Sequence, residues 1–201
     1  HLAFGDRIAN ALFLSATPRT AGFNNIDYAR ATDATNFLTI ILMFVGGSPG
    51  STAGGIKTTS FALVVLLAWS RFRGREIPFV WGRSLPEETI QRAIGLSVAA
   101  FALITASILV FTIMEPGGQP GTVAVVGNRF LALTFEAVSA FNTVGLSMGV
   151  TPILSDPGKV LAVLLMFIGR VGPLTFAAAL ALAAERRDVQ YRYAYEDVVV
   201  G

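Results

Sequence analysis

The sequence contains no cysteine, a single histidine and few charged residues for its length. Without cysteine there are no disulfides, no thiolate nucleophile and no cysteine zinc site, and His1 alone cannot form an imidazole cluster. Charged residues occupy 14% of the 201 positions, and the net charge is only +2. The basic residues are scattered and no nucleic-acid-binding motif is present. These absences exclude redox and zinc chemistry and a nucleic-acid partner.

Apolar residues, by contrast, make up 53% of the chain, a share typical of an integral membrane protein. Ala93–Met114 is a run of 22 residues without a charge. At 1.5 Å per residue such a helix crosses a hydrocarbon core of roughly 30 Å. The sequence therefore predicts a transmembrane helix here.

The chain begins at His1 without an initiator methionine, and we expect it to be part of a longer polypeptide.

Two further apolar stretches are interrupted. Asn36–Phe72 is about twice the length of one span, so we expect a helix to Val45, an unwound segment at membrane depth, and a second helix from about Thr58. Val160–Ala184 is long enough to span, but Arg170, Gly172 and Pro173 lie near its middle. Because glycine and proline disfavour a continuous helix, we expect this one to be interrupted there.

Two shorter segments, Asp6–Ala16 and Phe130–Phe141, have helical composition but too few residues to span a bilayer. Each is followed by a turn-rich stretch, the pattern of a helix that enters the membrane and returns. Arginines concentrate in residues 71–92 and in the tail after Ala184. The positive-inside rule therefore places these segments, and the C-terminus, in the cytoplasm.

An internal repeat relates the two halves of the chain. "TAGFN" at Thr20 matches "TVGLS" at Thr143, and "MFVG" at Met43 matches "MFIG" at Met166, both with an offset of 123 residues. Upstream, an "SA" pair at Ser15 and Ser139 matches with a slip of one residue.

Thr-x-Gly loops after short helices are suited to holding a dehydrated cation. Glycine permits the positive φ that such a turn needs, and successive carbonyl oxygens can replace the water shell of the ion. One copy usually marks an ordinary turn, but two at matching positions indicate a pore. The predicted filter residues are Thr20, Ala21, Gly22, Phe23, Thr143, Val144, Gly145 and Leu146. This hypothesis requires Gly22 and Gly145 to lie close together.

The segment "GGSPGSTAGGIKTTS", residues 46–60, has two rival interpretations. A Walker A phosphate loop fails by one residue, because Ile56 stands between Gly55 and Lys57. Unwound chain inside a bilayer must instead be buried by protein or line a water-filled cavity. We favour a mobile loop that can obstruct a conduction path over a kinked helix with a glycine hinge. The predicted gate residues are Gly46, Gly47, Ser48, Pro49, Gly50, Ser51, Thr52, Gly54, Gly55 and Lys57.

Hydroxyls of this segment are expected to form hydrogen bonds with the freed backbone groups. These hydroxyls belong to Ser48, Ser51, Thr52, Thr58 and Thr59.

Arg170 completes the predicted gate. An arginine near the centre of a span costs several kcal/mol unless it faces protein or water. The carbonyls of the unwound segment are its most available acceptors, although snorkelling stays open for Arg170 and for Lys57.

Three acidic residues, Asp27, Asp33 and Glu136, are candidates for enriching cations at the outer mouth. For Asp27 and Asp33, solvated surface charge is the favoured explanation.

Four motifs together resemble the Ktr/Trk/HKT superfamily of potassium transporters: "TPRTAGFNNID", "GGSPGSTAGGIKTTS", "FNTVGLSMGVTP" and "MFIGRVGPLTFA". The closing "YAYEDVVVG" resembles the membrane subunit of Ktr. This implies an all-α polytopic membrane protein whose repeats comprise an outer helix, a re-entrant pore helix, a filter loop and an inner helix around a pseudo-fourfold pore. Residues 1–70 are then a third repeat without its outer helix, 71–92 a cytoplasmic loop, 93–184 a fourth repeat and 185–201 a cytoplasmic tail.

The resemblance implies potassium uptake through a multi-pass protein of the bacterial inner membrane, with sodium as an activator in many members. It also implies an intramembrane gating loop held by Arg170, homodimers, and a cytosolic RCK ring that binds ATP, ADP or NAD, whereas this chain has no nucleotide site of its own. Only two of four filter strands are present. The alternatives are a Trk-type potassium or sodium/potassium transporter, a membrane enzyme that binds phosphate, and a non-conducting assembly subunit. The chain lacks paired catalytic groups, so we do not expect an enzyme.

Overall fold

The computed structural model describes residues 3–74, 79–80, 83–84, 86–115 and 128–172, and these residues are mostly helical. The α-helices are α1 (Phe4–Ala16), α2 (Asp33–Phe44), α3 (Thr58–Phe72), α4 (Glu87–Met114), α5 (Arg129–Phe141) and α6 (Asp156–Val171). Two 3-10 turns cover Tyr28–Arg30 and Thr151–Ile153. Strands β1 (Phe79–Val80) and β2 (Arg83–Ser84) form a short antiparallel pair before α4.

The helix positions agree with the sequence expectations, with small shifts of their ends. α2 ends at Phe44 and α3 begins at Thr58, so the expected break in this apolar stretch is present. α4 begins earlier than the charge-free run, at Glu87. Acidic residues in a first turn favour the positive end of the helix dipole, which explains this extension. α6 ends at Val171, where an interruption was expected, and residues 173–184 lie outside the described residues.

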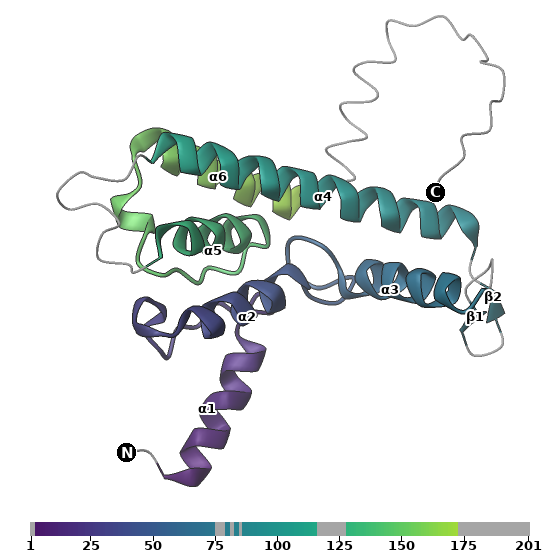
Figure 1. Cartoon of the computed structure of the whole chain (residues 1–201), viewed down its shortest axis with the longest axis horizontal. Coiled ribbons are helices and arrows are strands. Elements are labelled where there is room, and N and C mark those ends of the chain that lie inside the picture. Colours follow the sequence, from purple (N-terminus) through teal and green to yellow (C-terminus); the bar gives the residue numbers. More distant parts are fainter. Residues whose placement is uncertain (1–2, 75–78, 81–82, 85, 116–127, 173–201) are drawn as a thin grey trace, which may run out of the picture.

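The short helix α5 is the centre of the arrangement. In Figure 1, α4 and α6 lie side by side along the long axis, α5 lies next to them, and α2 lies on the other side of α5. α3 runs beside the other part of α4, while α1 projects away from the bundle. Nearly every residue of α5 from Leu131 onward is buried, whereas α1 buries none. The core of the described residues is therefore built around a helix too short to span a bilayer.

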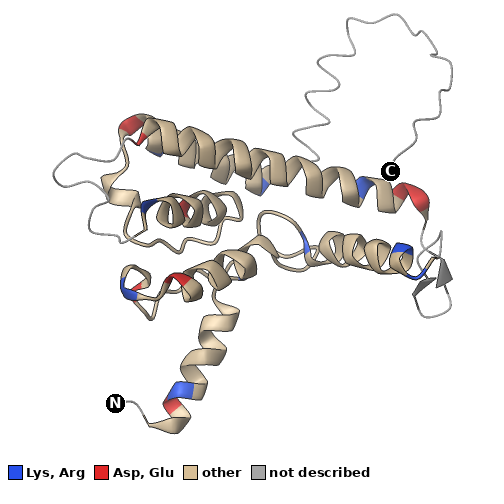
Figure 2. Ribbon diagram, in the orientation of Figure 1, with Lys and Arg blue, Asp and Glu red and all other residues tan. Residues whose placement is uncertain are grey.

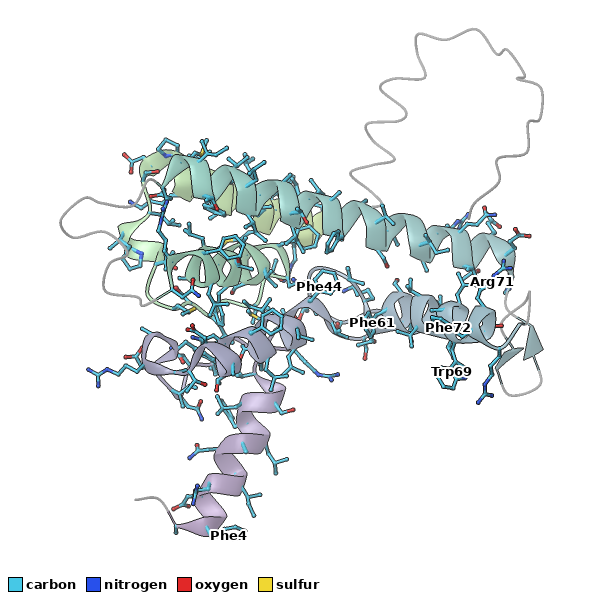
Figure 3. All side chains as sticks on the ribbon, viewed as in Figure 1. Phe4, Phe44, Phe61, Trp69, Arg71 and Phe72 are labelled. Carbon is cyan, nitrogen blue, oxygen red and sulfur yellow. The ribbon has the colours of Figure 1, made fainter. Side chains whose placement is uncertain are left out.

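The outer surfaces of the longer helices are apolar. Among the described residues, α4 alone is long and apolar enough to cross a membrane, and only 22% of its apolar 18-residue stretch is buried. Figure 2 shows most charged residues near the ends of the bundle rather than along the middle of its helices. Trp69 of α3 points away from α4 in Figure 3, and the guanidinium of Arg73 lies 4.9 Å from its ring centroid. Such an aromatic and basic pair suits a membrane interface.

A buried carboxylate joins the end of α4 to the start of α6. Oε1 of Glu115 accepts hydrogen bonds from the backbone N–H of Ser155, at 2.9 Å, and from the Ser155 hydroxyl. The Ser155 hydroxyl in turn caps α6 by accepting from the N–H of Gly158, at 3.2 Å. A Cβ atom at position 158 would overlap the Glu115 carboxylate. A negative charge at this helix N-terminus is also favourable to the helix dipole.

We predict that Glu115→Ala destabilises the protein by about 1 to 3 kcal/mol, because it leaves the partly buried Ser155 N–H without its acceptor. Thermal unfolding of the purified full-length protein in detergent measures this. Glu88→Ala, which breaks an exposed ion pair with Arg92, is the control and should change stability by less than about 1 kcal/mol. Equal effects of the two substitutions would contradict the proposed role of Glu115.

Candidate ion-conduction site

The two Thr-x-Gly loops have the same unusual backbone conformation. Thr20 and Gly22 have φ values of +67° and +71°, and Thr143 and Gly145 have φ values of +51° and +91°. Among the described residues, these two threonines are the only non-glycine residues with positive φ. A β-branched residue in this region is strained, so the surroundings must hold it there. The internal repeat in the sequence therefore corresponds to a repeat in conformation.

A side-chain hydroxyl at the end of each short helix forms a hydrogen bond with the loop that follows that helix. The Thr17 hydroxyl, just after α1, donates to the carbonyl oxygen of Phe23 at 2.7 Å. The Ser139 hydroxyl, in the last turn of α5, donates to the carbonyl oxygen of Leu146 at 2.6 Å. The alignment of the repeat pairs Ser15 with Ser139, but the structure shows that Thr17 makes the equivalent bond. The shared signal in the sequence is a hydroxyl residue at the end of each short helix.

The two loops meet. A Cβ atom at position 22 would overlap the carbonyl oxygen of Val144 and would lie 3.8 Å from the Cα of Gly145. The Val144 carbonyl therefore points at the backbone of the first loop, and Gly22 is required both by its positive φ and by this approach. Nothing lies within 4 Å of the corresponding Cβ position at Gly145. Loops more than a hundred residues apart in the chain thus come together, as the pore hypothesis requires.

The surroundings of the two loops differ. Val144 and Leu146 are 4% and 2% exposed, because α5 and its neighbours enclose the second loop. Phe23 of the first loop is 70% exposed, and α1 buries no residue. The described residues therefore supply a full environment for the second loop only.

The segment between α2 and α3 folds back on itself. The N–H of Gly46 donates to the Ile56 carbonyl at 3.0 Å, and the N–H of Thr58 donates to the Gly47 carbonyl at 3.1 Å. Of the hydroxyls expected to bond freed backbone groups, that of Ser51 does so, donating to the Ser48 carbonyl at 2.6 Å. Nζ of Lys57 donates to the Ala53 carbonyl. The broken helix is a closed loop and not a hinge.

This loop contacts the second repeat at three points. The N–H of Gly54 donates to the hydroxyl of Thr143 at 3.1 Å, and the N–H of Gly55 donates to the Gly169 carbonyl at 3.1 Å. A guanidinium nitrogen of Arg170 donates to the Thr52 carbonyl. The contact expected between Arg170 and the loop is therefore present. Residues 53–56 are buried, whereas residues 48–52, including Pro49 and Gly50, are exposed.

Close backbone packing explains the glycines at this junction. A Cβ at position 54 would lie 2.6 Å from the Thr143 hydroxyl, and one at position 55 would overlap the side chain of Asn142. A Cβ at position 169 would overlap the Phe141 carbonyl. Asn142 is fully buried; its Nδ2 donates to the Val138 carbonyl at 2.9 Å, while its Oδ1 has no hydrogen-bond partner in the described residues. The sequence analysis did not single out Asn142, since a lone asparagine carries no motif.

A hollow of about 330 Å³ separates the first Thr-x-Gly loop from the segment between α2 and α3. It is lined by Arg19, Thr20, Gly46, Gly47, Ser48, Ser51, Thr52, Ala53 and Thr58. The lining includes backbone and hydroxyl groups, and the buried hydroxyl of Thr20 has no partner among the described residues. A hollow therefore lies directly beside one predicted filter loop and the predicted gate.

The three acidic candidates for the outer mouth have different positions. Asp27 is exposed, caps the turn at Tyr28–Arg30 and pairs with Arg30 at 3.5 Å. Asp33 is exposed in the first turn of α2. Glu136 is buried in α5 instead of lying at a solvated mouth. No group of three or more His, Cys, Asp or Glu side chains able to hold a metal occurs in the described part of the chain.

The described residues form a largely helical fold with one helix able to cross a membrane, and a family model matches the chain. Residues 1–188 match the TrkH family model, described as a cation transport protein. This chain belongs to that family. The family is described as one of cation transport proteins, not of enzymes.

Two curated relatives are similar over almost the whole chain. The potassium/sodium uptake protein NtpJ of Enterococcus hirae is 38% identical over 198 residues, covering 98% of this chain and 42% of the relative. The Ktr system potassium uptake protein B of Bacillus subtilis is 37% identical over 191 residues, covering 95% and 40%. The chain therefore spans about two fifths of the length of these relatives.

The fold is similar to that in a solved structure of a family member. The crystal structure of the potassium transporter TrkH from Vibrio parahaemolyticus matches with a TM-score of 0.74 and 21% identity. The match covers 90% of this chain and 38% of that protein. At this identity the match supports the helical fold, and roles for individual residues rest on the geometry described above.

We predict that Gly22→Ala destabilises the full-length protein by about 1 to 3 kcal/mol, because it combines backbone strain with an overlap at Val144. Gly145→Ala introduces only the strain and should cost less. Gly95→Ala, in α4 with open space around it, is the control and should be neutral or stabilising by about 0.5 to 1 kcal/mol. Thermal unfolding of the three variants measures these differences in stability. Equal stability of Gly22→Ala and Gly95→Ala would contradict the contact between the loops.

Proposed function

We propose that this chain forms part of the potassium-translocating subunit of a Ktr-type uptake system, with two of its filter strands at Thr20–Phe23 and Thr143–Leu146. The observation that supports this best is the meeting of Gly22 with the Val144 carbonyl. Carbonyl oxygens gathered between loops can replace the hydration shell of a potassium ion. The C-terminal ends of α1 and α5 add partial negative charge beside the same loops.

Not all carbonyls of the loops are equally available. The carbonyl oxygens of Phe23 and Leu146 already accept hydrogen bonds from the hydroxyls of Thr17 and Ser139. We therefore assign the ion-facing oxygens to the preceding residues of each loop other than Val144, whose carbonyl faces Gly22. The remaining strands of the ring come from two further repeats, which the family resemblance implies for the full-length protein.

The loop at residues 46–57 is our candidate for the gate. It is compact, it lies against the second filter loop through Gly54 and Thr143, and it adjoins the hollow beside Thr20. Arg170 holds it through the Thr52 carbonyl. Because these contacts are few and polar, a modest change in free energy can release the loop.

The alternative of a phosphate-binding enzyme is disfavoured by the hydrogen bonds of this loop. A phosphate cradle needs free backbone N–H groups. Here the N–H groups of Gly46, Gly54 and Gly55 all donate to protein acceptors.

Ion preference is the main point on which the candidate functions differ. The similar proteins are named for potassium uptake in one case and for potassium/sodium uptake in another. We propose potassium as the transported ion and sodium as an activator, with a Trk-type sodium/potassium transporter as the alternative. Comparing rubidium and sodium uptake by the full-length protein separates these two.

The further assignments rest on the family resemblance. We propose a location in the inner membrane of a bacterium with the C-terminus in the cytoplasm. We also propose a homodimer on a cytosolic RCK ring that binds ATP, ADP or NAD. The tail at 185–201, which would face this ring, lies outside the described residues.

We predict that Gly145→Asp reduces rubidium uptake by full-length protein in liposomes at least about tenfold, because a carboxylate disrupts the ring of carbonyl oxygens. Gly5→Asp places the same group in open space at the start of α1 and should leave uptake unchanged. Uptake by Gly145→Asp equal to that of Gly5→Asp would exclude the filter assignment.

For the gate, we predict that Arg170→Ala raises resting rubidium flux about tenfold, since a hydrogen bond to a charged group contributes about 1.5 to 3 kcal/mol. Deleting residues 48–55 should raise it as well. Arg92→Ala removes an exposed arginine of α4 and serves as the control. Unchanged or lower flux through Arg170→Ala, at normal protein abundance, would argue against this gate.

A further inference from the structure

The buried acid of α5, Glu136, has a role that the proposed function does not yet use. Its side chain is in the central helix of the bundle and is only 4% exposed. A carboxylate so placed is costly unless hydrogen-bond donors satisfy it. The groups that donate hydrogen bonds to Glu136 therefore indicate its role.

Glu136 is satisfied by two hydroxyls from the segment that follows the second filter loop. Oε2 accepts from the Ser147 hydroxyl at 2.8 Å, and Oε1 accepts from the Thr151 hydroxyl. The two hydroxyl oxygens are 3.0 Å apart, and the Ser147 oxygen also accepts from the N–H of Gly149 at 3.0 Å. An ionised carboxylate is an acceptor at both oxygens, so it matches two hydroxyl donors.

These bonds lie directly beside the proposed filter. Ser147 directly follows Leu146, and the Leu146 carbonyl accepts a hydrogen bond from the Ser139 hydroxyl. Ser139 lies about one turn after Glu136 on α5. The end of the filter loop is therefore fixed to α5 at two successive points. Loss of the second point frees the loop without removing any of the proposed filter residues.

The first loop has a weaker and uncharged counterpart. There, Nδ2 of Asn25 donates to Oδ1 of Asn10 in α1 at 3.2 Å, and this pair is exposed. At the repeat offset from Glu136 the first half carries Phe13. The two loops share a backbone conformation, but only the second is held by a buried carboxyl group.

We infer that Glu136 is a positioning residue that sets the cation selectivity of the second filter loop; this inference rests on the proposed function. Its carboxylate fixes the loop end through Ser147 and Thr151, so that the carbonyl oxygens keep the spacing required by the larger, more weakly hydrated ion. Its charge also adds to the field that attracts a cation. A neutral side chain of the same size supplies neither two acceptors nor the charge.

The test measures rubidium and sodium uptake, each per mole of full-length protein incorporated into liposomes. Glu136→Gln should lower the ratio of rubidium to sodium uptake about tenfold, and Ser147→Ala and Thr151→Val about two- to fivefold each. Thr151→Ser keeps the hydroxyl and should restore the wild-type ratio. Glu115→Gln is the matched control, because Glu115 is the other buried carboxylate of the described residues and also accepts two hydrogen bonds. It should lower stability and leave the ratio unchanged.

The outcomes separate the two levels of the proposal. No rubidium uptake by the wild-type protein would overturn the proposed function, and this inference with it. A selective wild type, with ratios for Glu136→Gln and Ser147→Ala equal to that of Glu115→Gln, would overturn this inference alone. Should Glu136→Gln fail to incorporate, the comparison of Thr151→Val with Thr151→Ser decides, since both keep Glu136; equal ratios would overturn the inference.

Discussion

Backbone that is not helical within an apolar bundle must find hydrogen-bond partners in the protein, and this constraint organises the structure. The chain leaves its helical path between Phe44 and Thr58. Part of the freed backbone bonds within the loop itself, as between Gly46 and Ile56. The rest bonds to the second repeat, at Thr143, Gly169 and Arg170. Glycine is needed where these backbones touch, because a Cβ would overlap its neighbour.

The same constraint makes α5 the organising helix. It is short, so its C-terminal end lies inside the bundle, where it must pass the chain into a loop with two left-handed residues. The hydroxyl of Ser139 and the carboxylate of Glu136 hold that loop from one side, and the α2–α3 segment contacts it through Thr143 from another. The proposed gate between α2 and α3 would be mechanically linked to the filter loop that follows α5, since movement of the gate at Gly54 removes a hydrogen bond to Thr143.

The sequence predicted the locations of helices and loops well, but it assigned some side chains incorrectly. The break after α2 and the ends of α1 and α5 follow from glycine, hydroxyl and apolar residues that lie next to one another in the chain. The repeat correctly paired the two Thr-x-Gly loops, whereas it matched Ser15 with Ser139 although Thr17 makes the equivalent bond. Glu136 was a candidate for enriching cations at the outer mouth, and the sequence did not predict its burial. Its burial depends on helices that pack around α5, and no local pattern encodes that.

The amino-acid sequence by itself determined the class of protein, the approximate helix positions, the interruption and the presence of two similar loops. These properties depend on composition and on interactions between neighbouring residues. Only the tertiary structure decided which groups meet: Gly54 with Thr143 across 89 residues, and Arg170 with Thr52 across 118. It also decided that Gly22 faces the carbonyl of Val144. Such contacts arise when distant segments are packed against one helix, and the residues involved carry no mark of their partners in the linear chain.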